Sequence, residues 1–259
     1  MKTVILAGGY GSRIMEETIN KPKPMIEIGG KPILWHIMKI YSFYGHNDFI
    51  ICLGYKGEVI KNYFIDFLYN NNDIKISTSK KKIEIIKNNK EVNWNVTLVN
   101  TGLHTKTAER LLKVSHLINS SNFFMTYGDG LSNININKLY KFHKINKRSA
   151  TVTAVNPTPR FGKLDVVNNQ IINFKEKKRK YTNELINGGF FILNKRIFKL
   201  INNFENRMWE DEPIQELIDK NELSGYHHDD FWYPVDTLRD KNYLEKLWDE
   251  NRAPWKIWE

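Results

Sequence analysis

Near the start of the chain, a glycine-rich segment is followed by a short segment of lysines and prolines. The chain reads LAGGYGSR and, a few residues later, KPKPM. Gly8, Gly9 and Gly11 leave the backbone free to bend and to approach a ligand closely, and their N–H groups can face a phosphate. Arg13 can bind phosphate oxygens through two donors, while Lys23 supplies a compact charge between two stiff prolines. These features favour an anion-binding loop over the alternative, a tight strand-to-helix turn.

Two aspartates follow apolar, strand-like runs that are far apart in the sequence. Asp129 lies in TYGDG and Asp236 lies in PVDTLRD. A carboxylate at the carboxyl end of a strand lies where open α/β sheets bind ligands. Mg²⁺ prefers one or two carboxylates, completed by phosphate oxygens and water. We therefore predict that the two aspartates share a Mg²⁺ ion. The alternatives are a simple turn at Gly-Asp-Gly and a helix N-cap at Asp236.

A third polar group is formed by FKEKKRK and the following INGGFFIL. Glu176 and Lys177 end one predicted strand, and Asn187 and Gly188 begin another. A lysine beside a glutamate can hold a phosphate while the carboxylate orients hydroxyl groups. The alternative for the basic residues is a solvated loop. This group is a candidate second substrate site.

Strand-like and helix-like runs alternate through most of the chain, which predicts a mainly parallel α/β sheet with helices on both faces. Residues 74–100 instead alternate with period two and carry a turn signal at Asn88-Asn89, so we predict strands and a hairpin there. No repeat or Gly/Ser/Pro linker interrupts the chain, which favours one domain over residues 1–259. The predicted strands are 3–7, 48–53, 122–126, 149–155, 162–167, 170–175, 189–193 and 223–227, and the predicted helices are 33–44, 56–69, 108–117, 136–147, 195–201, 212–220 and 237–248.

Composition narrows the class of partner. The 259 residues carry a formal charge of +10 and a pI near 9.4, which points to nucleic acid, a membrane surface or phosphorylated small molecules. No run approaches the roughly 20 apolar residues of a membrane span, and no secretory signal is evident, so we expect a cytoplasmic protein. No helix with clustered basic residues is evident, which disfavours nucleic-acid binding. Cys52 is the single cysteine, so no internal disulfide is possible.

The motifs, in this order, resemble those of sugar-1-phosphate nucleotidylyltransferases. Longer stretches are similar to the glucose-1-phosphate cytidylyltransferases within that family, namely GGKPILWHIMKIYS, NDFIICLGYKG, WNVTLVNTG, INGGFF and APWKIWE. The resemblance extends over essentially the whole chain. It implies a single Rossmann-like nucleotidyltransferase domain with a mixed central sheet. It also implies that CTP and α-D-glucose 1-phosphate react with each other, with Mg²⁺ as cofactor, to give CDP-D-glucose and pyrophosphate. The product would be used in dideoxysugar and surface-polysaccharide synthesis.

The same resemblance implies roles for individual residues. Arg13 and Lys23 would act on the phosphates at the reacting centre, and Asp129 and Asp236 would hold Mg²⁺. Residues 1–130 would form the nucleotide-binding part, 131–235 the sugar-phosphate part and 236–259 a C-terminal helix and tail. The insertion near residues 74–96 resembles an arm that contacts neighbouring subunits, which implies a homo-oligomer. The nucleotide would contact Leu6, Ala7, Gly8, Gly9, Gly11, Ser12, Arg13, Lys23, Thr107, Arg110 and Gly128, and the sugar phosphate would contact Gly162, Glu176, Lys177, Asn187 and Gly188.

Two departures from the family pattern concern the substrates. Thr-Gly-Gly-Arg-Leu is expected before one helix, but the chain has Ala108 and Glu109 in place of the two glycines. Glu-Lys-Pro is expected near the sugar phosphate, but Lys178 replaces the proline. An enzyme of the same fold with another sugar phosphate or nucleotide therefore stays as an alternative. A catalytically silent homologue, motivated by Glu109, is a third.

Overall fold

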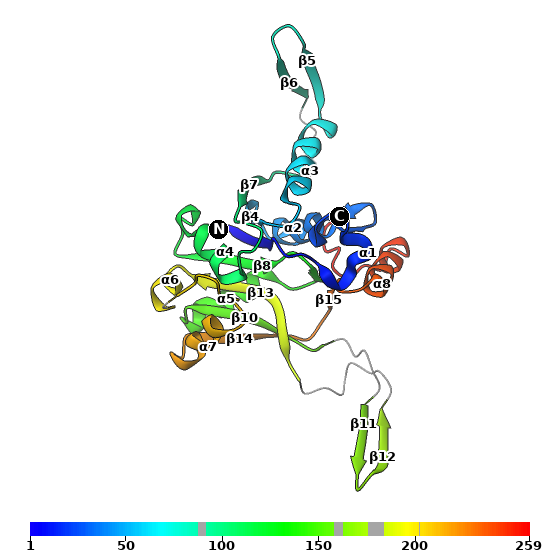
Figure 1. Ribbon diagram of the computed structural model, residues 1–259, viewed down its shortest axis with the longest axis vertical. Coiled ribbons are helices and arrows are strands. Elements are labelled where there is room, and N and C mark those ends of the chain that lie inside the picture. The colour runs from blue at the N-terminus through cyan, green and yellow to red at the C-terminus, as the bar shows by residue number, and fades with distance from the viewer. Residues whose placement is uncertain (88–91, 158–162, 176–183, 202) are drawn as a thin grey trace.

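A mixed seven-stranded sheet forms the centre of the computed structural model, which describes residues 1–87, 92–157, 163–175, 184–201 and 203–259 (Figure 1). Four neighbouring strands are parallel, and β13 runs antiparallel between β8 and β10. The mixed α/β sheet is the one expected from the sequence. In spatial order its strands are β14 (Leu223–His228), β10 (Ala150–Val155), β13 (Ile186–Asn194), β8 (Asn122–Tyr127), β1 (Thr3–Ala7), β4 (Asp48–Leu53) and β7 (Asn95–Asn100).

The central strands are apolar along their whole length because both faces of the sheet are covered. On β1, Ile5 belongs to a buried cluster that includes side chains of α2 and α8, whereas Val4 belongs to a second cluster with α4 and α7. Successive side chains of a strand point to opposite faces, so a buried strand needs apolar residues at every position. The predicted two-sided arrangement of helices is confirmed.

Each of the seven helices predicted from the sequence is present with approximately the predicted bounds. Three short elements between β1 and β2, namely η1, α1 and η2, were not predicted. Among the described residues, no helix combines the length and the apolar character that crossing a lipid bilayer requires. The helices are α1 (Met15–Thr18), α2 (Ile33–Phe43), α3 (Gly57–Asn70), α4 (Thr107–Lys113), α5 (Ile136–Asn146), α6 (Ile197–Leu200), α7 (Glu212–Asp219) and α8 (Leu238–Asp249), with 3-10 turns η1 (Ser12–Ile14), η2 (Lys23–Met25) and η3 (Ser115–Leu117).

Two hairpins project from opposite ends of the molecule, β5 (Asp73–Ser77) with β6 (Lys82–Lys87), and β11 (Lys163–Val167) with β12 (Gln170–Lys175) (Figure 1). A hairpin exists within 74–100, but the predicted pairing was wrong: β5 pairs with β6 around a turn at 78–81, and β7 pairs with β4 in the central sheet. The predicted turn at Asn88-Asn89 lies outside the described residues. Period-two alternation identifies strands without saying which strands pair, which explains the error. Two short pairs complete the strands, β2 (Glu27–Ile28) with β3 (Lys31–Pro32) and β9 (Gly130–Ser132) with β15 (Trp232–Pro234).

The C-terminal tail packs against α2 through a buried histidine. Trp255 is fully buried, and its indole N–H donates to Nδ1 of His36 at 3.3 Å. Nε2 of His36 lies 2.8 Å from the carbonyl oxygen of Ile28, so this nitrogen carries the proton and donates it. Burial lowers the pKa of His36 to about 4. The tail is thereby tied to β2, the strand that follows Lys23.

Candidate active site

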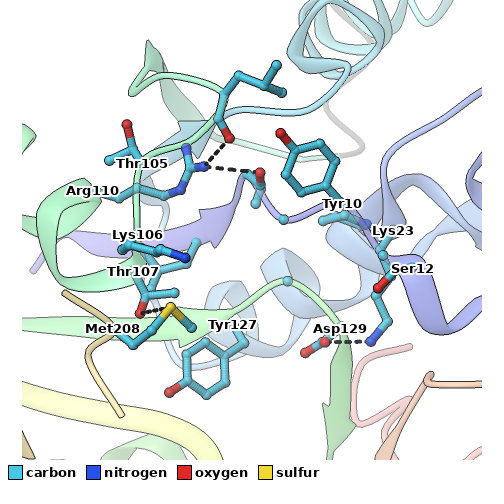
Figure 2. A pocket seen from close by; sticks show the side chains of 18 of the residues that line it. Tyr10, Ser12, Lys23, Thr105, Lys106, Thr107, Arg110, Tyr127, Asp129 and Met208 are labelled. Atoms are coloured by element: carbon cyan, nitrogen blue, oxygen red, sulfur yellow. Dashed lines mark hydrogen bonds and ion pairs between the residues drawn. The ribbon is translucent and has the colours of Figure 1, made fainter. Parts of the chain in front are cut away.

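A cavity of about 550 Å³ opens at the carboxyl ends of β1 and β8 (Figure 2). The end of β1 and the glycine loop form one side, and Gly128 and Asp129 follow β8 on the other. This is the place where open α/β sheets bind ligands. All residues that we predicted to contact a nucleotide line this cavity, namely Leu6, Ala7, Gly8, Gly9, Gly11, Ser12, Arg13, Lys23, Thr107, Arg110 and Gly128.

Two of the three glycines of the loop are required for steric reasons. Gly11 has φ +66°, and a Cβ there would lie 2.8 Å from Cγ2 of Thr18. A Cβ on Gly8 would lie 2.3 Å from Cζ of Arg110. At Gly9, in contrast, a Cβ would meet no atom within 4 Å, so packing does not demand glycine there. Two of the three glycines let the loop fold tightly, and Gly9 leaves open space beside the cavity.

Arg110 supports the loop from behind. It is 4% exposed, and its guanidinium donates to the carbonyl oxygens of Gly8, Leu53 and Gly102 at 3.1, 2.9 and 2.8 Å. It also donates to Oγ1 of Thr101 at 2.6 Å. These acceptors lie at the ends of β1, β4 and β7. Arg110 therefore lines the cavity as predicted, but its charged donors are directed at the protein backbone.

Four charged side chains converge at the other end of the cavity. Nζ of Lys23 lies 2.7 Å from Oδ2 of Asp129 and 2.8 Å from Oδ1 of Asp236, and the first of these contacts is drawn in Figure 2. A guanidinium nitrogen of Arg13 lies 2.8 Å from the other carboxylate oxygen, Oδ2, of Asp236. Lys23 is only 8% exposed, which is unusual for lysine and is possible because two carboxylates pair with its charge. Two anions and two cations thus balance each other.

The alternative role of Asp236, capping a helix, is wrong in the structure. Thr237 is the N-cap of α8, and its hydroxyl accepts the N–H of Asp240 in a capping box. The side chain of Asp236 instead pairs with Lys23 and Arg13, which line the cavity, whereas Asp236 itself is absent from the lining. The predicted pairing of Asp129 with Asp236 brings together residues from the ends of different strands.

The chemistry of these donors fits Mg²⁺. Asp129 and Asp236 both contact the Lys23 ammonium, so their carboxylates lie close enough to share one cation. Carboxylate oxygens are ligands that Mg²⁺ prefers, and the ion takes its remaining ligands from phosphate and water. No group of three or more acidic, histidine or cysteine side chains with metal-site geometry occurs in the part of the chain that the structure describes. A metal ion in this cavity would therefore depend on Asp129 and Asp236 together with the oxygens of its ligand.

A family model described as nucleotidyl transferase matches residues 2–245. The chain belongs to this family. It is 49% identical over 261 residues to the glucose-1-phosphate cytidylyltransferases of Salmonella typhi and Salmonella typhimurium (strain LT2), with 100% of each chain covered. HddC from Yersinia pseudotuberculosis, a solved structure, has a TM-score of 0.69 at 21% identity, over 95% of this chain and 99% of that one. The resemblance found in the sequence motifs is confirmed.

In this nucleotidyl transferase, the predicted sugar-phosphate residues are only partly described. Asn187 donates from Nδ2 to the hydroxyl of Tyr127 at 3.2 Å, and Tyr127 lines the cavity. Gly188 accepts the indole N–H of Trp232 at 2.6 Å through its carbonyl oxygen. Gly162, Glu176 and Lys177 lie outside the described residues, so their roles stay predictions.

Nine lining residues were not predicted as site residues from the sequence, namely Tyr10, Pro24, Leu103, His104, Thr105, Lys106, Tyr127, Met208 and Glu210. The hydroxyl of Thr107 donates to Oε2 of Glu210 at 2.8 Å and accepts the N–H of Trp209 at 2.7 Å. Burial raises the pKa of Tyr127, and the neighbouring carboxylate of Glu210 raises it further. Tyr10 and Tyr127 lie within the motifs LAGGYGSR and TYGDG, which was a usable signal, whereas nothing in the local sequence marks Glu210.

The departure at Glu109 lies away from the cavity. Its carboxylate is 2.9 Å from Nζ of Lys113, one turn along α4, and accepts the N–H of Asn206 at 3.2 Å. The hydrogen bond from Lys113 lowers the pKa of Glu109. Glu109 is absent from the lining of the cavity, and therefore its charge gives no reason to expect a silent site.

Proposed function

We propose that the chain transfers the cytidylyl group of CTP to α-D-glucose 1-phosphate, giving CDP-D-glucose and pyrophosphate. The observation that carries the proposal is the 49% identity, over the full length, to proteins named glucose-1-phosphate cytidylyltransferase. The physical support is a cavity with a glycine loop at one side and a cluster of two cations and two carboxylates at the other.

The proposed reaction is a single displacement at phosphorus. A phosphate oxygen of glucose 1-phosphate forms a bond to the α-phosphorus of CTP, and the bond from that phosphorus to the bridging oxygen breaks, so its electron pair leaves with pyrophosphate. No covalent enzyme intermediate is needed, because such chemistry depends on positioning and charge neutralisation. The N–H groups of the glycine loop bind and orient the triphosphate.

Arg13 and Lys23 supply the positive charge in this mechanism. Both form ion pairs with carboxylates in the structure, and phosphate oxygens would compete for the same N–H donors. Asp129 and Asp236 would hold Mg²⁺, which when bound neutralises phosphate charge that lysine and arginine do not reach. Thr107 and Gly128 border the nucleotide, and Glu176, Lys177, Gly162, Asn187 and Gly188 are the proposed contacts of the sugar phosphate.

A substrate panel tests the proposal directly. The purified protein is incubated with CTP, UTP, GTP, ATP or dTTP, each with several sugar 1-phosphates and Mg²⁺, and pyrophosphate release is followed. We expect the highest kcat/KM for CTP with glucose 1-phosphate. Turnover with another pair only would identify a different nucleotidylyltransferase of this fold, and no turnover with CTP and any sugar phosphate would refute the proposal.

We also propose that the chain forms a homo-oligomer and resides in the cytoplasm, where it would supply surface-polysaccharide synthesis. The hairpins support the first point, since Ile76, Ile172 and Phe174 are 61%, 63% and 61% exposed and a lone two-stranded hairpin is marginally stable in water. A second copy would cover this apolar surface. Light scattering on the purified protein would reveal a monomer if the idea is wrong. The division at residues 130 and 235 into nucleotide and sugar-phosphate parts stays a prediction.

A further inference from the structure

The helix α8 runs behind the charged cluster and contacts each of three segments that supply it. Asp236 lies two residues before α8, Arg13 lies in η1, and Lys23 lies in η2. These segments are distant in sequence, with Lys23 and Asp236 separated by 213 positions. Three acidic or basic side chains of α8 each bind one of them. None of the residues of α8 lines the cavity, so the helix affects the cavity indirectly, through these three contacts.

The first contact fixes the backbone that carries Asp236. Oδ2 of Asp240 accepts the N–H groups of Asp236 and Thr237 at 3.1 and 2.8 Å. Asp240 is 5% exposed, so water competes little for these hydrogen bonds. The backbone of Asp236 is therefore tied to the first turn of α8.

The second contact holds the segment that carries Arg13. Lys241 forms an ion pair with Glu17 of α1, the helix that follows η1 without a break. The hydrogen bond from Lys241 lowers the pKa of Glu17, so the carboxylate keeps its charge and the ion pair persists to lower pH. Lys21 also lies 3.6 Å from Glu17, but it belongs to the same segment and cannot attach that segment to α8. The side chain of Arg13 is 70% exposed, so its position depends on its backbone as well as on its ion pair with Asp236.

The third contact holds the turn that follows Lys23. Oε1 of Glu245 accepts the N–H of Gly29 at 3.0 Å, and Gly29 connects β2, which follows η2, to β3. Gly29 has φ +59°, and a Cβ there would lie 2.0 Å from Nε1 of Trp248 on α8. Only glycine combines this backbone conformation with such close packing.

We propose that α8 sets the positions of Arg13 and Lys23 relative to Asp236, with Lys241 and Glu245 as positioning residues. The inference rests on the proposed function in one respect, namely that Arg13 and Lys23 are the cations that meet the phosphates. Charge-assisted contacts are short and directional. A small shift of η1 or η2 therefore weakens phosphate binding without unfolding the protein.

A double-mutant cycle tests the role of Lys241. Binding of inorganic pyrophosphate in the presence of Mg²⁺ is measured by calorimetry for the wild-type chain, Lys241→Met, Arg13→Ala and the double variant. We expect Lys241→Met to raise Kd about tenfold in the wild-type background and less than about twofold in the Arg13→Ala background, because coupled residues are non-additive. Lys241→Arg should bind nearly as well as wild type.

The matched control is Lys246→Met, since Lys246 lies on the same helix with its side chain 69% exposed. It should leave Kd unchanged. Glu245→Met, combined with Lys23→Met in a second cycle, tests the other contact in the same way. Thermal unfolding of every variant shows whether it is folded at the temperature of the titration.

Three outcomes decide the inference. Equal losses from Lys241→Met in both backgrounds would mean that it acts by general destabilisation, and this overturns the proposal, as does a wild-type protein that binds no pyrophosphate. Coupling to Arg13 supports it. Because binding is measured without turnover, a protein that shows the coupling but transfers no cytidylyl group refutes the proposed function and leaves the positioning role of α8 intact.

Discussion

Removing the Lys23 ammonium should make the nucleotide-free protein bind a divalent cation more tightly. In the structure this ammonium lies between the carboxylates of Asp129 and Asp236, at 2.7 and 2.8 Å. A metal ion that uses the same oxygens must first displace it. Lys23→Met keeps an unbranched side chain of similar length but removes the competing charge. The same change should lower kcat by about 100-fold, since a preorganised charge at the phosphates is lost.

The size of the effect follows from the two contacts. A hydrogen bond to a charged group contributes about 1.5–3 kcal/mol. The displaced ammonium of the wild-type protein regains part of this free energy by binding water. We therefore take about 2 kcal/mol, within the range for one such hydrogen bond, as the free-energy cost of displacing Lys23. Each 1.4 kcal/mol corresponds to about a factor of ten in affinity. We therefore expect Mn²⁺, used as the probe, to bind roughly 30-fold more tightly to Lys23→Met.

Electron paramagnetic resonance of free Mn²⁺ measures this affinity without any nucleotide present. Lys21→Met is the matched control, because Lys21 is two positions away, pairs with Glu17 and does not line the cavity; it should bind Mn²⁺ like wild type. Adding Asp129→Asn to Lys23→Met should abolish the gain. Equal or weaker Mn²⁺ binding by Lys23→Met would refute the idea that lysine and metal share the carboxylates.

Three further predictions concern the surroundings of the cavity. Arg110→Lys should destabilise the protein by about 3 kcal/mol, because lysine cannot satisfy several buried carbonyl oxygens at once; urea unfolding measures this, and a loss below 1 kcal/mol would contradict it. His36 has a pKa of about 4 when folded and an ordinary value when unfolded, so its contribution to stability is present above pH 6.5 and is lost as the pH falls. Between pH 7 and 5 this loss should be about 2 kcal/mol. Burial lowers the pKa of His46 and His143 to about 4 as well, so His36→Gln should reduce the total loss between pH 7 and 5 by about 2 kcal/mol in the same assay, and an unchanged loss would contradict the prediction. Glu109→Gln should change KM for CTP by less than about twofold, as expected for a surface pair outside the cavity, and a fivefold rise would place Glu109 at the substrate.

The central strands and long helices could be predicted because burial on both faces leaves a simple apolar signal. β1 and β4 have the predicted bounds, and each is apolar at nearly every position. The segments η1, α1 and η2 have three or four residues each, too few to display a period. Pairing of strands depends on distant partners, and therefore the hairpin at 73–87 and the place of β7 were not recoverable from local alternation.

The candidate site could be predicted where a position tolerates only glycine or where its chemistry requires a particular charged side chain. Gly8 and Gly11 have steric reasons that only glycine meets, and such reasons leave a mark in the sequence. The direction of Arg110 left none, because an arginine on a helix reads the same whether it faces a ligand or carbonyl oxygens. Likewise, the choice between a cap and a charge partner at Asp236 depended on its neighbour Thr237, which took the cap.

The bonds of Arg110 have a mechanical consequence for the cavity. One planar guanidinium fastens the glycine loop to the ends of β4 and β7, so the three cannot shift independently. From the end of β4 the chain continues into α3 and then into the projecting β5–β6 hairpin (Figure 1). A ligand that displaces the glycine loop should therefore also move the end of β4, which leads through α3 into the β5–β6 hairpin. Ligand binding and the position of this hairpin should consequently be coupled.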